Sequence, residues 1–238
     1  MNRIKRNILL SFLVVLFLSC HRQNTGYVLT GNFKGLGSQP VELRFFTYET
    51  TEVISVTKMD SAGNFCFTGK VGEAGIYGLK PAFSGEDQYV LFFLDNSRLH
   101  IRADATGNDY IITEVSGNKR SEEFQELQKF YMAMLAESAH LFEELNTSFL
   151  SKKEYENEMQ KLNMQFIGSM KRLIDKTNEP VHAVFLLSLL NLQENLPFIK
   201  SAMEKLNIMA PECIYVKQYN EKVQYAERIL SKHRTVAN

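Results

Sequence analysis

Residues 60–69 are Asp-Ser-Ala-Gly-Asn-Phe-Cys-Phe-Thr-Gly, a turn followed by a strand. Asp60 can hydrogen-bond to the backbone that follows it, and Gly63 tolerates positive φ, so the first half predicts a chain reversal. Phe65 and Phe67 then alternate with smaller residues at the two-residue period of a half-buried strand. The segment therefore predicts antiparallel β structure on both sides of it.

The same pattern continues outward from Tyr27 to about Ser116, where short apolar runs alternate with turn residues and no helical spacing intervenes. The expected strands are 27–33, 41–47, 53–59, 65–71, 76–80, 89–94, 99–103 and 110–115. Between them, the segments 35–38, 60–64 and 95–97 are expected to form hairpin turns. Short strands at this spacing predict an antiparallel β-sandwich or open barrel over residues 27–117.

The pattern changes at residues 117–118, after which apolar residues recur at helical spacing. A first helix is expected over 121–145. A second opens at Ser151, because Ser151 and Glu154 have the spacing of a capping box. These two helices are expected to form an antiparallel hairpin.

Proline residues indicate the starts of the remaining helices, since proline is favoured in the first helical turn. Pro180 precedes a run, residues 183–190, that is apolar nearly all round and is expected to be the central buried helix of this half. Pro197 and Pro211 indicate two further starts. Residues 118–238 are thus predicted to form an α-helical module, which makes the fold class α+β.

The N-terminus has the pattern of an export signal. A short cationic start precedes an apolar run, residues 8–18, that is too short to span a hydrocarbon core of about 30 Å. The run ends in Leu-Phe-Leu-Ser-Cys at residues 16–20, which resembles a bacterial lipobox with Phe17 in place of the more usual Leu. The resemblance implies a signal peptide over 1–19, lipid attachment at Cys20 and a lipidated tether over 20–26. An ordinary secretory signal with a chance cysteine and an uncleaved anchor are the alternatives.

Two or three acyl chains, which the lipobox resemblance implies, would hold the protein on a membrane far more firmly than one chain. His21 stands where many inner-membrane lipoproteins have Asp, so we expect the outer membrane, with the protein facing the periplasm. The chain has 27 basic and 27 acidic residues, and Arg3, Lys5 and Arg6 lie in the expected signal peptide. Their loss leaves a net charge of about −3, so no nucleic-acid partner is expected.

The other two cysteines, Cys66 and Cys213, would lie in an oxidising compartment where a disulfide is permitted. The sequence favours two structural thiols packed as small hydrophobic groups, and a bond between them is the alternative. No Cys-x-x-Cys motif is present, which argues against a self-contained dithiol oxidoreductase.

A search for sites predicts no catalytic, cofactor-binding or metal-binding residue. The histidines have no zinc-binding spacing, and His182, near the start of the apolar helix, is expected to cap it or to be partly buried. They are His21, His100, His140, His182 and His233. The glycines of 31–37 join two strands and do not open a helix, so they indicate a turn and not a phosphate site.

Aromatic residues are frequent in the β half, and core packing is favoured over a ligand groove as their role. They include Phe45, Phe46, Tyr48, Phe83, Phe92 and Phe93. Adjacent residues of a strand point to opposite faces, so Phe45 and Phe46 predict a sheet with apolar side chains on its outer face as well. That outer face is expected to meet the helical half.

These features together resemble a family: the uncharacterised β domain at the N-terminus of envelope thiol:disulfide interchange lipoproteins related to TlpA and ResA. The matching features are the lipobox at Cys20, residues 27–31, the D-x-x-G-x-F-x-F-x-G arrangement of 60–69, residues 93–96, and residues 179–183, where family members begin their buried helix. In those relatives a thioredoxin-like domain with a Trp-Cys-x-x-Cys site follows, and this chain is expected to lack it. The resemblance implies fold and compartment, and it carries over no functional residue beyond Cys20.

The leading hypothesis is therefore a non-enzymatic binding or scaffold role in the envelope, with a membrane contact through lipid and an envelope protein as partner. The alternative is an accessory role in periplasmic thiol-disulfide exchange beside a separate thioredoxin-like partner, which rests on analogy alone. A third possibility is a hydrolase whose site is assembled only by folding.

Overall fold

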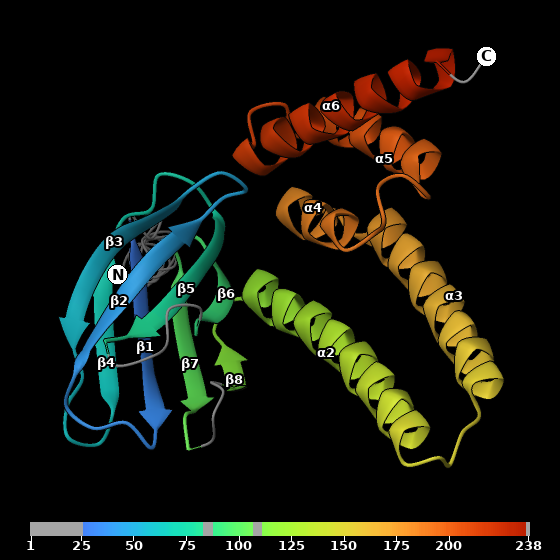
Figure 1. Cartoon of the computed structure of the whole chain (residues 1–238). Coiled ribbons are helices and arrows are strands. Elements are labelled where there is room, and N and C mark those ends of the chain that lie inside the picture. The colour runs from blue at the N-terminus through green and yellow to red at the C-terminus, as the bar shows by residue number, and fades with distance from the viewer. Residues whose placement is uncertain (1–25, 83–87, 107–110, 237–238) are drawn as a thin grey trace, which may run out of the picture.

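The computed structural model describes residues 26–82, 88–106 and 111–236 (Figure 1). Eight strands are followed by five helices, which confirms the α+β class. The strands are β1 (Tyr27–Lys34), β2 (Pro40–Phe46), β3 (Thr51–Lys58), β4 (Asn64–Gly69), β5 (Gly75–Pro81), β6 (Val90–Leu94), β7 (Arg98–Asp104) and β8 (Ile111–Ser116). The helices are α2 (Lys119–Asn146), α3 (Lys152–Lys176), α4 (Pro180–Ser188), α5 (Leu196–Met209) and α6 (Ile214–Val236). The expected signal peptide and Cys20 lie outside the described residues.

The strands form two four-stranded sheets, in the orders β4-β1-β7-β8 and β3-β2-β5-β6. Side chains from both sheets fill one apolar core between them, as in a sandwich. The core includes Leu29 and Phe33 of β1, Leu43 of β2, Leu79 of β5, Phe92 of β6 and Ile101 of β7. One pairing departs from the antiparallel expectation: β1 and β7 run parallel.

The segments expected to be hairpin turns are not hairpins. Residues 35–38, 60–64 and 95–97 each connect strands that belong to different sheets. The hairpins are instead β2–β3, β5–β6 and β7–β8. Turn residues predict that the chain reverses, but they do not determine which strand it pairs with afterwards.

The corner at Asp60 shows how local chemistry directs the chain from one sheet to the other. The Asp60 carboxylate accepts hydrogen bonds from the backbone N–H groups of Ala62, at 2.8 Å, and Asn64, at 2.9 Å. Gly63 has φ +82°, and a Cβ there would lie 2.3 Å from the carbonyl oxygen of Phe33. Only glycine fits, because both the backbone conformation and the close approach exclude a side chain.

Strand β3 is an edge of its sheet, with Val53, Ile54 and Val56 exposed. The pairing with β2 shifts so that Leu43 faces Ser55 and Arg44 faces Val53, which leaves Ile54 opposite no residue. Such a bulge twists the edge and interrupts its row of outward hydrogen-bonding groups.

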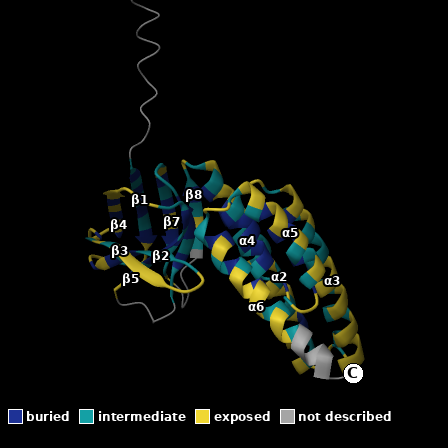
Figure 2. Ribbon diagram, turned by 90° about the horizontal axis from the view of Figure 1, so that it is seen from above, coloured by how far each residue is buried: buried dark blue, intermediate teal, exposed yellow. Residues whose placement is uncertain are grey.

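Strand β6 has an apolar residue on each face. Phe92 is buried in the sandwich core, whereas the adjacent Phe93 is buried in a second core formed by the helices. The prediction that one sheet carries apolar side chains on its outer face and meets the helical half is therefore confirmed. Helix α4 is the buried centre of that half, as expected, with exposed residues along α3 (Figure 2).

The helix starts follow the sequence signals at three points and depart from them at one. Ser151 and Glu154 form the capping box, and Pro180 and Pro197 lie in the first turns of α4 and α5. The last helix begins at Ile214 and not at Pro211. Its first N–H donates to the Glu73 carboxylate at 2.8 Å, a partner from the β4–β5 connection that local sequence cannot indicate.

Replacing Gly63 by Ala should lower the free energy of unfolding by about 2 kcal/mol, because it introduces strain at positive φ and a backbone clash. Gly37→Ala is the matched control, since a Cβ at Gly37 would have no atom of the described residues, apart from its chain neighbours, within 4 Å. Urea unfolding of both variants measures the difference. Equal stability of the two variants would contradict this account of the corner.

Candidate functional site

The sandwich and the helices are joined by a charged cluster at the start of α2. Asn118 caps this helix, accepting from the Arg120 N–H at 2.9 Å, and its amide donates to Asp95 at 2.7 Å. The Arg120 guanidinium reaches Glu179 at 2.6 Å and Asp95 at 3.3 Å. It also lies 4.4 Å from the ring centroid of Phe93. Arg120 therefore bridges three elements: the end of β6, the start of α2 and the start of α4.

His182 lies directly beneath this cluster, where it is 1% exposed. Its ring stacks on Phe124 at 5.6 Å and meets the edge of Phe93 at 5.3 Å. Among the residues that the structure describes, its Nε2 has no hydrogen-bond partner. Burial lowers the pKa of His182 to about 4, and the positive Arg120 adds to the decrease while Glu123 opposes it. The expectation of a capping or partly buried histidine is wrong: His182 is a neutral ring within the core.

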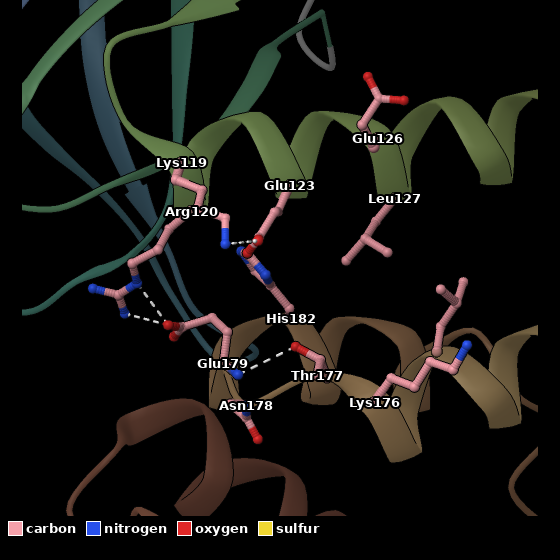
Figure 3. A pocket seen from close by; sticks show the side chains of 11 residues that line it. Lys119, Arg120, Glu123, Glu126, Leu127, Lys176, Thr177, Asn178, Glu179 and His182 are labelled. Atoms are coloured by element: carbon pink, nitrogen blue, oxygen red, sulfur yellow. Dashed lines mark hydrogen bonds and ion pairs between the residues drawn. The ribbon is translucent and has the colours of Figure 1, made fainter.

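A cleft of about 580 Å³ opens above His182, between α2 and the segment that joins α3 to α4 (Figure 3). Its walls carry both signs of charge, and the charges are largely compensated in pairs. These are Arg120 with Glu179 at 2.6 Å, Lys119 with Glu123 at 3.4 Å, and Glu126 with Lys129 at 2.8 Å. The last two pairs lie within α2, so it is the pair of Arg120 and Glu179 that braces the junction. Within the described ranges, no three His, Cys, Asp or Glu side chains are placed to hold a metal ion.

A second contact joins the halves at α6. The Tyr215 hydroxyl donates to the carbonyl oxygen of Phe46 at 2.5 Å and accepts from the N–H of Ile76 at 2.7 Å, so it binds the last residue pair of the β2–β5 ladder. Gly75 makes room for it, since a Cβ there would lie 2.6 Å from the hydroxyl. Beside Tyr215 lies an apolar pocket of about 210 Å³, and Phe46 and Tyr48 line it.

Helices α2 and α3 with the loop between them, residues 119–176, extend away from the sandwich as an arm (Figure 1). Their buried residues are concentrated at the end nearest the sandwich, with Leu141 as the exception. Large apolar side chains are exposed along the rest: Met132, Leu135, Phe142, Phe149 and Met164. The arm is thus the place where apolar surface is most extended on the helical half.

The cysteines and the other histidines do not converge on one site. Cys66 is exposed on β4 and Cys213 is half-buried before α6, and both are free, so Cys66 is not the packed thiol that was expected. Burial raises the pKa of Cys213. His100 is hydrogen-bonded to Thr30 on the neighbouring strand at 3.0 Å, and His140 lies on the arm. His21 and Phe83 lie outside the described residues, and so does the side chain of His233.

The residues that organise the junction were missed by the sequence reading. Asp95, Arg120, Glu179 and Tyr215 are far apart in the chain, and nothing in the sequence indicated that they meet. Residues 93–96 and 179–183 were singled out only through the family resemblance.

Lowering the pH from 6.5 to 4 should reduce the free energy of unfolding through His182. At pH 4 the unfolded histidine is almost fully protonated, whereas the folded one, with a pKa of about 4, is about half protonated, a difference of about 3 kcal/mol at the acid end. His182→Phe removes this contribution while filling the same space. Urea unfolding of both proteins across the range measures it, with His182→Gln as a second variant. A stability difference between wild type and variants that does not change with pH would contradict the assignment.

A search of curated proteins finds no match to this chain. A family model does match, over residues 27–124, which include all eight strands and the first turns of α2. The family's description gives no activity. Residues 27–124 therefore match the model of a domain of unknown function, DUF4369.

Proposed function

We propose that this protein is a non-enzymatic binding or scaffold component of the cell envelope, held by lipid on Cys20 at the outer membrane and facing the periplasm. Its contact surface for another envelope protein is the arm. The observation that carries the proposal is the set of exposed apolar side chains there, of which Phe149 is 82% and Phe142 54% exposed. Contiguous apolar surface is uncommon on soluble monomers and marks interaction sites.

The spacing of these residues supports one continuous surface on α2. Leu135 and Phe142 follow Met132 by three and ten residues, and residues at these spacings lie on the same face of a helix. Methionine side chains, here Met132 and Met164, adapt their shape to different partners and are frequent at binding surfaces. A helix of 28 residues is about 42 Å long, so α2 gives the arm a long reach.

The proposed anchor sets where this surface acts. The seven residues of 20–26 span at most about 25 Å when extended, so the sandwich would lie close to the membrane. In the part of the chain that the structure describes, no helix combines the length and apolarity needed to cross a bilayer. The resemblance to the TlpA and ResA lipoproteins supports the same compartment, and we propose that relationship on the motifs alone.

Photocrosslinking in intact cells tests the arm. A benzophenone amino acid at position 149 should give a discrete crosslinked protein, and the same probe at Ile208 is the control, because Ile208 is 85% exposed on α5. Cys20→Ser should move the protein to the soluble fraction and weaken the adduct. The proposal fails if neither position 149 nor position 142 gives an adduct, or if position 208 gives the same one.

The thiol-exchange role is a second candidate, and the exposure of Cys66 on the edge strand β4 favours it. A separate thioredoxin-like partner could reach this thiol without unfolding the sandwich. Acid-trapped cells should then contain a mixed disulfide that is lost in Cys66→Ser and kept in Cys213→Ser. Its absence from wild-type cells would remove this candidate.

A further inference from the structure

We infer that the tip of the arm, residues 137–156, docks a basic amphipathic segment of the partner, in which Lys or Arg side chains flank apolar ones. This rests on the proposed function and names the chemistry of the partner at the same surface. The tip is the end of the arm farthest from the sandwich (Figure 1).

The backbone conformation at the tip keeps the side chain of Phe149 exposed. The N–H of Phe149 donates to the carbonyl oxygen of Glu144 at 3.0 Å, and the N–H of Ser148 to that of Leu145 at 3.2 Å. These two bonds, with Ser148 at φ 63°, form a Schellman motif at the end of α2. In that motif the residue at the place of Phe149 usually packs against an apolar side chain in the last turn. Here the residues at those positions of the last turn are Glu143 and Glu144, so Phe149 remains exposed.

The loop conformation that keeps Phe149 exposed has a conformational cost at Ser148. Ser148 is the one non-glycine residue with positive φ in the described chain, and side chains other than glycine are disfavoured there. The hydrogen bonds of the motif hold Ser148 in this conformation. The loop therefore keeps Phe149 directed outward instead of folding it against the arm.

The charges at the tip are not balanced. Residues 137–156 contain five glutamates and two lysines. The last turn of α2 has no basic residue, and the C-terminal end of a helix carries partial negative charge, so Glu143 and Glu144 add to an already negative helix end. Of the two lysines, Lys152 lies 3.9 Å from Glu156. The tip is thus a negative surface with an exposed aromatic residue at its centre.

A hollow of about 320 Å³ lies at this helix end, lined by His140, Glu143, Glu144, Thr147 and Phe149. A Lys or Arg side chain placed there would neutralise the glutamates, lie against the negative end of the helix dipole and meet the face of Phe149. An apolar neighbour in the same segment would cover Phe149, which is 82% exposed. An anionic membrane or the tip of a second copy has the same sign of charge, and each would be repelled.

The test uses the full chain in nanodiscs of zwitterionic lipid, with empty nanodiscs subtracted. The probe is a fluorescent 15-residue peptide with Lys and Leu or Phe at helical spacing, and its counterpart has Glu for every Lys. We expect the Lys peptide to bind and the Glu peptide not to bind. The affinity of the Lys peptide should fall as the salt concentration is raised. Phe149→Ser and the pair Glu143→Gln with Glu144→Gln should each weaken binding about tenfold. The matched control, Ile208→Ser with Glu204→Gln on α5, should leave it unchanged.

Each other outcome overturns the inference. Equal binding by arm and control variants would show non-specific attraction, and equal binding of the Glu peptide would exclude charge recognition. Phe149-dependent flotation with anionic vesicles would indicate a membrane site, and a Phe149-dependent dimer in light scattering would indicate a second copy. If crosslinks at position 149 persist in cells while the Lys peptide fails to bind, the partner chemistry is wrong and the binding role stands. Thermal melting of the Glu→Gln pair checks folding, because removing negative charge from a helix C-terminus should not destabilise it.

Discussion

The alternation of side chains along β6 is the constraint on which the two-part architecture depends. Successive residues of a strand face opposite ways, so the adjacent Phe92 and Phe93 cannot be buried in the same core. Phe92 belongs to the sandwich, and Phe93 requires a cover on the outer face of the sheet. The helices supply it through Phe124 and His182, whose rings contact Phe93 or each other. The helical half is therefore part of the fold of this sheet and not an independent appendage.

Polar contacts then determine how the cover is oriented. Arg120, with Asp95 and Glu179, fixes the starts of α2 and α4, while Tyr215 and Glu73 fix the start of α6. These contacts lie at two separate places on the junction and restrict rotation of one half against the other. The arm is consequently built on a braced base, and its far end keeps a defined direction relative to the sandwich.

The sequence was sufficient to predict every strand and helix in the described chain, because the two-residue and helical periods of apolar residues are local properties. It also predicted the meeting of sheet and helices, from the adjacent aromatic pair at Phe45. It did not predict the order of strands in the sheets, since the turn at Asp60 indicates that the chain reverses but not which strand the next one pairs with. Arg120 and Tyr215 were missed because their roles arise only from residues distant in the chain. The exposure of Phe149 was missed because it depends on the conformation of the loop after α2, in which the residues that would usually cover it are Glu143 and Glu144.

The unpaired Ile54 of β3 affects how copies of the protein that are crowded on a membrane surface can associate. Proteins confined to a surface meet one another far more often than in free solution, and with similar orientations, which favours the joining of exposed strands into extended sheets. An interrupted edge offers the next molecule no regular ladder to continue. For a protein that we propose to be concentrated on a bilayer, this single extra residue would hinder neighbouring copies from joining through β3.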